Sequence, residues 1–205
     1  MQKIDVSKQS LQETNMLSIP CVIFAGGKSS RMGEDKALLP FAGFDTLTEF
    51  QYTRLSKIFT HLYISCKDKN KFSFPANYIE DKKGADVYAP TLAFISIFET
   101  LSSDSFFAIS VDSPFIDETI ITKLVEQNGE NVAATVALTD GKLQPLCGIY
   151  HHSLLPAFYT MLQENNHKLN NLLKNSRIDT VTFKDDNRFL NLNHPDEYKK
   201  ALQLI

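Results

Sequence analysis

Short apolar runs that alternate with helical patterns are the feature of this sequence that most limits its fold. They begin at Ile19 and continue to the C-terminus, with no linker, repeat or low-complexity stretch between them. Strands separated by helices of about 10 to 15 residues are typical of βαβ units and a mostly parallel sheet. The sequence therefore predicts an α/β fold in which residues 19–205 form one domain. Residues 1–18 are mostly polar and lack a sustained period, so we expect a loose N-terminal extension.

The apolar runs and the periodicity place the expected elements along the chain. Ligands in such sheets bind beyond the C-terminal ends of the strands, so the residues after Ala25, Ser65, Glu80 and Val111 are the first candidates for a site. Strands are predicted at 19–25, 62–66, 77–80, 106–111, 132–138, 143–150, 181–183 and 189–192. Helices are predicted at 46–59, 90–101, 117–127, 153–162, 169–173 and 194–204, and a short one is conceivable over 10–16.

Composition excludes several classes of protein. The 21 basic and 24 acidic residues give a net charge of −3, which disfavours a strongly basic nucleic-acid binder but allows one local cationic site. The three cysteines are widely spaced, and the five histidines show no ligand spacing, so we expect neither a disulfide framework nor a zinc site. No apolar run approaches the roughly 18 residues that span a bilayer, and the N-terminus is unlike a signal peptide. We therefore expect a soluble cytoplasmic protein.

A glycine-rich segment with basic side chains follows the first predicted strand. Gly26 and Gly27 allow the backbone to approach an anion and to turn its N–H groups toward it. Arg31 can hold phosphate oxygens in a bidentate fork, and Lys36 offers a compact ammonium group. The segment fits neither GxGxxG nor GxxxxGK[ST], and a glycine pair alone more often marks a plain turn between a strand and a loop. Together these residues favour a triphosphate site, because that charge must be balanced before a nucleophile can approach phosphorus.

Two carboxylates follow other predicted strands at the same edge of the sheet. Asp112 comes directly after the strand at 106–111, where it could cap a turn or bind Mg²⁺. Magnesium favours one or two carboxylates together with phosphate oxygens, and Asp112 would lie opposite the triphosphate segment. Asp81 ends the strand at 77–80, and its carboxylate could accept hydrogen bonds from guanine N1–H and the exocyclic amine or simply cap a turn.

The string AGGKSSRMGEDKALLPFAG, from Ala25 to Gly43, resembles the signature of the nucleotidyltransferases related to molybdenum cofactor guanylyltransferase. The resemblance implies a Rossmann-like three-layer α/β/α sandwich with a mixed, mostly parallel sheet. It also implies that the backbone of Phe24, Ala25 and Gly26 holds the nucleotide, with Gly27 beside them and Arg31 and Lys36 on the phosphates. The string SVDSPFI resembles the family element whose aspartate binds Mg²⁺, which implies that role for Asp112. Asp81 aligns with the family's acidic position that contacts the nucleotide.

Two further elements resemble the family on the side of the acceptor. Asn191 and Asn193 match an N-x-N element that lies near the pterin substrate, although Asn193 could also simply cap the last helix. The string from Gln144 to Tyr150 resembles a strand that lines the acceptor, and a plain core strand is the alternative. The chain departs from the family around Pro90, where both glycines of a Gly-Pro-Leu-x-Gly segment are missing.

The resemblance implies a magnesium-dependent enzyme that transfers GMP from GTP to molybdopterin and releases pyrophosphate. Alternatives are transfer of CMP to molybdopterin, a sugar- or polyol-phosphate nucleotidyltransferase, and a non-catalytic module that binds GTP. We expect a monomer that uses Lys36, Arg31 and Asp112 in catalysis, passes its product to molybdoenzyme chaperones or cofactor-insertion proteins, and binds no nucleic acid or membrane. We also expect Lys36 and Asp112 to face each other across a gap as wide as a metal-bound triphosphate.

Overall fold

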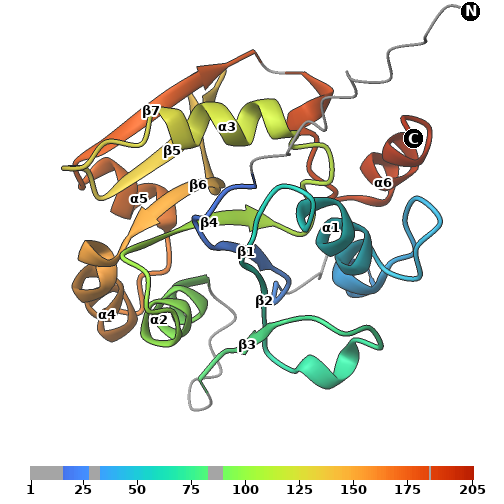
Figure 1. Cartoon of the computed structure of the whole chain (residues 1–205), viewed down its shortest axis with the longest axis horizontal. Coiled ribbons are helices and arrows are strands. Elements are labelled where there is room, and N and C mark those ends of the chain that lie inside the picture. Colours follow the sequence, from blue (N-terminus) through green and yellow to red (C-terminus); the bar gives the residue numbers. More distant parts are fainter. Residues whose placement is uncertain (1–15, 28–32, 83–89, 185) are drawn as a thin grey trace, which may run out of the picture.

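The structure is a computed structural model that describes residues 16–27, 33–82, 90–184 and 186–205. Figure 1 shows a twisted sheet with helices on both faces. The strands are β1 (Cys21–Phe24), β2 (Leu62–Cys66), β3 (Tyr78–Glu80), β4 (Ser105–Ser110), β5 (Ala134–Thr139), β6 (Lys142–His151) and β7 (Ile178–Phe183). The α-helices are α1 (Leu47–Leu55), α2 (Pro90–Thr100), α3 (Glu118–Glu126), α4 (Leu155–Gln163), α5 (Leu169–Lys174) and α6 (Pro195–Leu202). Short 3₁₀ helices are η1 (Lys36–Leu38), η2 (Lys69–Lys71), η3 (His152–Leu154) and η4 (Asn187–Phe189).

The described strands form one mixed sheet in the order β3-β2-β1-β4-β6-β5-β7. Strands β3, β2, β1 and β4 are parallel, and β7 is parallel to β5. Strand β6 runs antiparallel to both of its neighbours, β4 and β5. The predicted α/β class with a mostly parallel mixed sheet is therefore confirmed.

Alternate side chains of the central strands pack into two separate cores, as expected for strands covered on both faces. In β1, Cys21 and Ile23 face a core built with α1, α3 and α6, whereas Val22 and Phe24 face one built with α2, α4 and α5. The second core is rich in aromatic rings: Phe94 stacks on Phe158 with centroids 4.5 Å apart. In Figure 1, α2 and α4 lie side by side over this face. The helices of the two layers thereby hold the sheet rigidly from both sides.

Most of the predicted elements are present, with ends shifted by a few residues. The prediction at 62–66 coincides with β2, and α3 begins after Asp117, whose carboxylate accepts a hydrogen bond from the Ile120 N–H at 2.9 Å. The predicted strand at 189–192 is wrong, because its residues form the end of η4 and an extended segment without a strand partner. Strand β7 starts three residues earlier than predicted, at Ile178.

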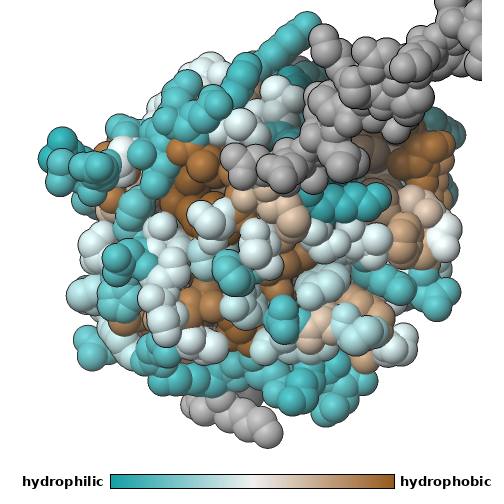
Figure 2. Space-filling view, viewed as in Figure 1, coloured by the Kyte–Doolittle hydropathy of each residue, from teal (hydrophilic) through white to brown (hydrophobic). Residues whose placement is uncertain are grey.

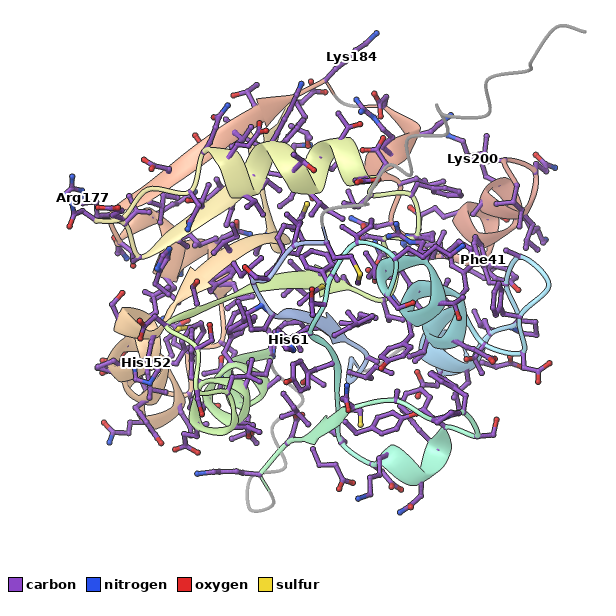
Figure 3. All side chains as sticks on the ribbon, in the orientation of Figure 1. Phe41, His61, His152, Arg177, Lys184 and Lys200 are labelled. Atoms are coloured by element: carbon purple, nitrogen blue, oxygen red, sulfur yellow. The ribbon has the colours of Figure 1, made fainter. Side chains whose placement is uncertain are left out.

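The surface fits this layered arrangement. Figure 2 shows hydrophilic side chains around most of the outline of one face, with hydrophobic side chains visible between them nearer its middle. Figure 3 shows Arg177 and Lys184 directed outward at the two ends of β7. Within the described ranges, no helix combines the length and the apolar character needed to cross a membrane. Leu17 forms a parallel bridge with Phe59, whereas residues 1–15 of the expected extension and the conceivable helix over 10–16 lie outside the described residues, apart from Met16.

Candidate active site

A cavity of about 210 Å³ opens at the C-terminal ends of β1, β2 and β4. This is the edge at which ligands of parallel α/β sheets bind. Its wall brings together seven of the residues that the sequence selected for the nucleotide: Phe24, Ala25, Gly26, Gly27, Lys36, Asp81 and Asp112. Asp35, Ser65, Pro90 and Leu146 complete much of the remaining wall. Arg31 lies outside the described residues, as do Ser29 and Ser30.

Lys36 and Asp112 are in direct contact in this cavity. The Lys36 Nζ lies 2.7 Å from Asp112 Oδ2 and 3.0 Å from Asn193 Oδ1, and both charged side chains are 16% exposed. We expected a gap as wide as a metal-bound triphosphate, and that expectation is wrong. Opposite charges that share a partly buried cavity lower their electrostatic energy by pairing directly. Lys36 and Asp112 lie on one side of the molecule, but a ligand between them has to part them.

The local sequence explains how Lys36 reaches this position. Asp35 caps the short helix η1 by accepting a hydrogen bond from the Ala37 N–H at 3.1 Å, and Lys36 is the first residue of that helix. The Thr48 hydroxyl, on the buried side of α1, donates to the Ala37 carbonyl at 2.7 Å. These contacts fix η1 against α1 and direct the Lys36 side chain to the end of β4.

Two side chains of α1, Gln51 and Arg54, fix the loop that carries Asp112 by hydrogen bonds. The fully buried Gln51 amide donates to the carbonyls of Ser110, Val111 and Ser113 at distances of 3.2, 3.3 and 3.1 Å. Its own oxygen accepts from Arg54 Nε at 2.6 Å. Sequence reasoning missed Gln51, and the only signal was a polar residue on the buried face of a helical pattern. Because the loop carbonyls share one donor group, the Asp112 backbone has little freedom to move.

Asp81 lies beside the glycine pair at the far end of the cavity. Burial raises the pKa of its carboxyl to about 6, although the charges of Lys67 and Lys71 and a 3.4 Å hydrogen bond from the Ser65 hydroxyl act in the opposite direction. A Cβ built on Gly26 would lie 3.7 Å from Asp81 Oδ2, which is an ordinary contact distance. The Asp81 carboxylate therefore lies near the Gly26 backbone, with room for a Cβ between them.

The glycine pair is not required by backbone strain. The structure records a positive φ at Gly33 and Gly43 but not at Gly26 or Gly27, and a Cβ built on Gly27 would meet nothing within 4 Å in the described part of the chain. Gly27 is exposed and lines the cavity. The physical reason that remains for this residue is the close approach of a ligand to its backbone.

A second cavity, of about 470 Å³, adjoins the first and shares part of its wall, including Ser110, Asp112 and Leu146. It contains both predicted acceptor-side residues, Asn191 and Asn193. Its other lining side chains come largely from β6 and the start of α5, among them Gln144, His167 and Lys168. His167 also lines this cavity, and its ring nitrogens lie 3.1 Å from the Thr91 hydroxyl and 2.9 Å from Asn165 Oδ1.

The strand predicted at 189–192 does not form, so neither Asn191 nor Asn193 lies on a strand. The Leu192 N–H donates to the Asp112 carbonyl at 2.9 Å, and this backbone bond helps to tie the C-terminal segment to the Asp112 loop. Asn191 Oδ1 accepts from the Ser113 hydroxyl at 2.6 Å, while Asn193 Oδ1 accepts from Lys36. Asn193 is not the cap of α6 either, since His194 occupies that position. The two amides thus reach opposite sides of Asp112.

The chain matches the model of the MobA-like NTP transferase domain over residues 21–181. It belongs to the MobA-like NTP transferase family. The matched region therefore runs from β1 into β7 and includes β3 and β4, the strands that precede Asp81 and Asp112.

Named relatives agree with this assignment. A molybdenum cofactor guanylyltransferase of Campylobacter jejuni subsp. doylei is 39% identical over 180 residues, which are 88% of this chain and 93% of the relative. A protein of the same name from Helicobacter pylori is 33% identical over 193 residues, with 92% and 94% of the two chains covered. The solved structure of molybdopterin-guanine dinucleotide biosynthesis protein A from Archaeoglobus fulgidus shares the fold, with a TM-score of 0.76, 18% identity and coverage of 91% and 98%.

Proposed function

We propose that this MobA-like chain transfers GMP from GTP to the terminal phosphate of molybdopterin and releases pyrophosphate. The names of the relatives support this reaction, and so does the arrangement of two cavities that meet at Asp112. The observation that carries the proposal is the Lys36–Asp112–Asn193 contact, because Lys36 lines the first cavity, Asn193 lines the second and Asp112 lines both. A reaction that joins two substrates needs such a shared boundary.

In this proposal the first cavity holds GTP. The Asp81 carboxylate accepts hydrogen bonds from the guanine N1–H and exocyclic amine, a donor pair that adenine and cytosine do not offer. Since the pKa of Asp81 is about 6, the carboxyl is largely ionised above neutral pH and can accept both bonds. The backbone of Ala25, Gly26 and Gly27 lines the path of the phosphates, and Lys36 leaves Asp112 to bind them. Arg31 is proposed to assist Lys36 from the sequence alone.

Asp112 is the proposed magnesium ligand, and the chemistry of the donor set fits this ion. Magnesium usually takes one or two carboxylates and completes its shell with phosphate oxygens and water. Asp112 supplies one partly exposed carboxylate at the cavity wall, and no group of three side chains that could hold a metal occurs among the residues described. When bound with GTP, the ion would neutralise phosphate charge and orient the phosphates. The role of Asp112 is to hold that charge beside the α-phosphorus.

The second cavity is the proposed acceptor site, with Asn191 and Asn193 near the pterin. A terminal phosphate oxygen of molybdopterin attacks the α-phosphorus, and a new P–O bond forms while the bond to the β-phosphate oxygen breaks. The phosphate nucleophile is already anionic, so no side chain has to remove a proton from it. Asn193 would align the acceptor, while Lys36 and the magnesium ion that Asp112 would hold would neutralise the phosphate charge. The monomeric state, the cytoplasmic location and delivery of the product to chaperones or cofactor-insertion proteins remain predictions from the sequence.

An assay of pyrophosphate release with each of the four NTPs, with and without molybdopterin, tests the proposal. We expect release that requires molybdopterin, Mg²⁺ and GTP. A preference for CTP would instead support cytidylyl transfer, and release with a sugar or polyol phosphate would reassign the acceptor. Binding of GTP without any pyrophosphate release would contradict catalysis and favour a binding module.

A further inference from the structure

Lys71, on the connection between β2 and β3, contacts both ends of the glycine-rich segment. Its Nζ donates to the Ala25 carbonyl at 3.0 Å and lies 2.8 Å from Asp35 Oδ2. The ammonium also lies 4.9 Å from the centroid of the Phe72 ring, and the Lys71 side chain is only 21% exposed. Ala25 and Asp35 flank residues 26–34, so one side chain from another part of the sheet joins the two ends of this segment.

Each of the two contacts bears on a residue that lines the first cavity. The Ala25 N–H already donates to the Ser65 carbonyl at 2.9 Å, so Lys71 fixes the other side of the same residue. Asp35 uses its second carboxylate oxygen to cap η1, whose first residue is Lys36. Lys71 therefore determines where the peptide that leaves β1 lies and where the helix that carries Lys36 begins.

Lys71 also has an electrostatic effect on the cavity. The Asp35 carboxylate lines the same wall as Lys36, so a bound triphosphate would meet a negative charge there. An ammonium 2.8 Å from that carboxylate, in a partly buried position, neutralises it. The cavity keeps the cap that Asp35 provides without the repulsion that its charge would otherwise exert on the phosphates.

We propose that Lys71 is a positioning residue of the nucleotide site, which holds Ala25 and Asp35 in place and cancels the charge of Asp35. The inference rests on the proposed function, because it takes GTP as the nucleotide. Lys71 itself does not line the cavity, so its effect passes through Ala25 and Asp35. It should therefore act on nucleotide binding more than on the chemical step.

The test compares Lys71→Met with Lys69→Met. Lys69 lies on the same 3₁₀ helix, but it is 55% exposed and its Nζ is 3.7 Å from Glu80, so its pair contributes little. We expect Lys71→Met to raise both the Kd for GTP, measured by calorimetry, and the KM for GTP about tenfold, with kcat within about twofold of the wild type. Lys69→Met should change neither constant, and Lys71→Arg should recover most of the loss because it keeps the charge.

A double variant separates the electrostatic effect from a general loss of structure. In an Asp35→Asn background the carboxylate charge is gone, while the amide oxygen can still accept from the Ala37 N–H. We expect Lys71→Met to cost about threefold in GTP affinity there instead of about tenfold. If Lys71→Met does not fold, as judged by circular dichroism, Lys71→Gln takes its place in both backgrounds, because it removes the charge and keeps a polar end group.

The outcomes distinguish the two proposals. A wild-type chain that binds GTP, together with a Lys71→Met chain that binds it equally well, would overturn the role of Lys71 and leave the proposed function intact. An equal tenfold loss in both backgrounds would also overturn it, because it would mark Lys71 as a residue of general stability. Failure of the wild-type chain to bind GTP at all would instead refute the proposed function, and with it the assignment of Lys71.

Discussion

Replacing Asp81 by Asn should stabilise the fold and at the same time damage the nucleotide site. Burial raises the pKa of this carboxyl from 3.8 to about 6 in the folded protein. The folded state therefore holds the proton more tightly than the unfolded state does. The contribution of Asp81 to stability is fully present below pH 3.8 and is lost as the pH rises through 6. At neutral pH the ionised carboxylate destabilises the folded state, because it is partly buried, whereas a neutral amide does not.

The magnitude follows from the size of the shift. One pKa unit corresponds to about 1.4 kcal/mol, so a shift of about two units sets an upper bound near 3 kcal/mol. Asp81 is partly exposed, and solvent screening reduces the expected gain to about 1 to 2 kcal/mol. For a chain of this length, that gain raises the Tm by about 2 to 8 °C. Thermal unfolding of both proteins, followed by circular dichroism from pH 4 to pH 8, measures it.

The refuting results are specific to pH and to the ligand. The advantage of Asp81→Asn should become small near pH 4, where the folded carboxyl is protonated and the unfolded one is about half protonated. A difference in Tm that does not change with pH would contradict the burial argument. The Asp81→Asn variant should also bind GTP at least about tenfold more weakly at pH 7.5, because the amide offers only one acceptor oxygen to guanine. Unchanged affinity for GTP would remove Asp81 from the proposed base site.

Three further substitutions test other parts of the site and the fold. Gln51→Met keeps the size of the side chain but removes the amide that donates to three loop carbonyls. The Ser110 carbonyl keeps the Ser113 N–H, whereas the buried bonds to Val111 and Ser113 are lost, so the free energy of unfolding should fall by about 2 kcal/mol in urea titrations. The same change should raise the Mg²⁺ concentration for half-maximal activity, and an unchanged value would refute its hold on Asp112. Gly148→Ala places a Cβ against the Thr135 carbonyl, near the bulge where β5 pairs with β6. This clash should lower the free energy of unfolding by about 3 kcal/mol. Gly27→Ala, by contrast, should fold normally and weaken GTP binding. Lys36→Met should lower kcat about 100-fold at unchanged Tm, and full activity would exclude its role on the phosphates.

The layered fold was predictable because its signals are local. An apolar run such as Leu62–Cys66 predicts a strand from its own residues, and a capping residue such as Asp117 predicts where a helix begins. The wrong prediction at 189–192 has a non-local cause. Leu192 is fully buried and bonds to the Asp112 carbonyl, so the sequence needs an apolar residue there although that residue is not in a strand. Strand β7 was predicted too short because its edge position leaves Asp179 and Thr180 exposed, which hides the first half of the strand.

The candidate site was predictable only where chemistry and motif coincide. Lys36 belongs to the glycine-rich motif after the first strand, and Asp112 is a carboxylate that follows β4. The structure brings the two side chains into contact. Gln51 and Lys71 could not be found in this way, because both act on backbone carbonyls that no sequence pattern identifies. The carbonyls that they contact lie at least 46 residues away in the chain, so only the folded structure reveals these contacts.

A crystal structure of the chain with GTP and Mg²⁺, without acceptor, would show whether the nucleotide separates Lys36 from Asp112. We expect Lys36 to leave Asp112 for the phosphates, an Asp112 oxygen to lie about 2.1 Å from the metal, and guanine to face Asp81. A structure in which GTP binds while the 2.7 Å contact between Lys36 and Asp112 stays intact would contradict this expectation.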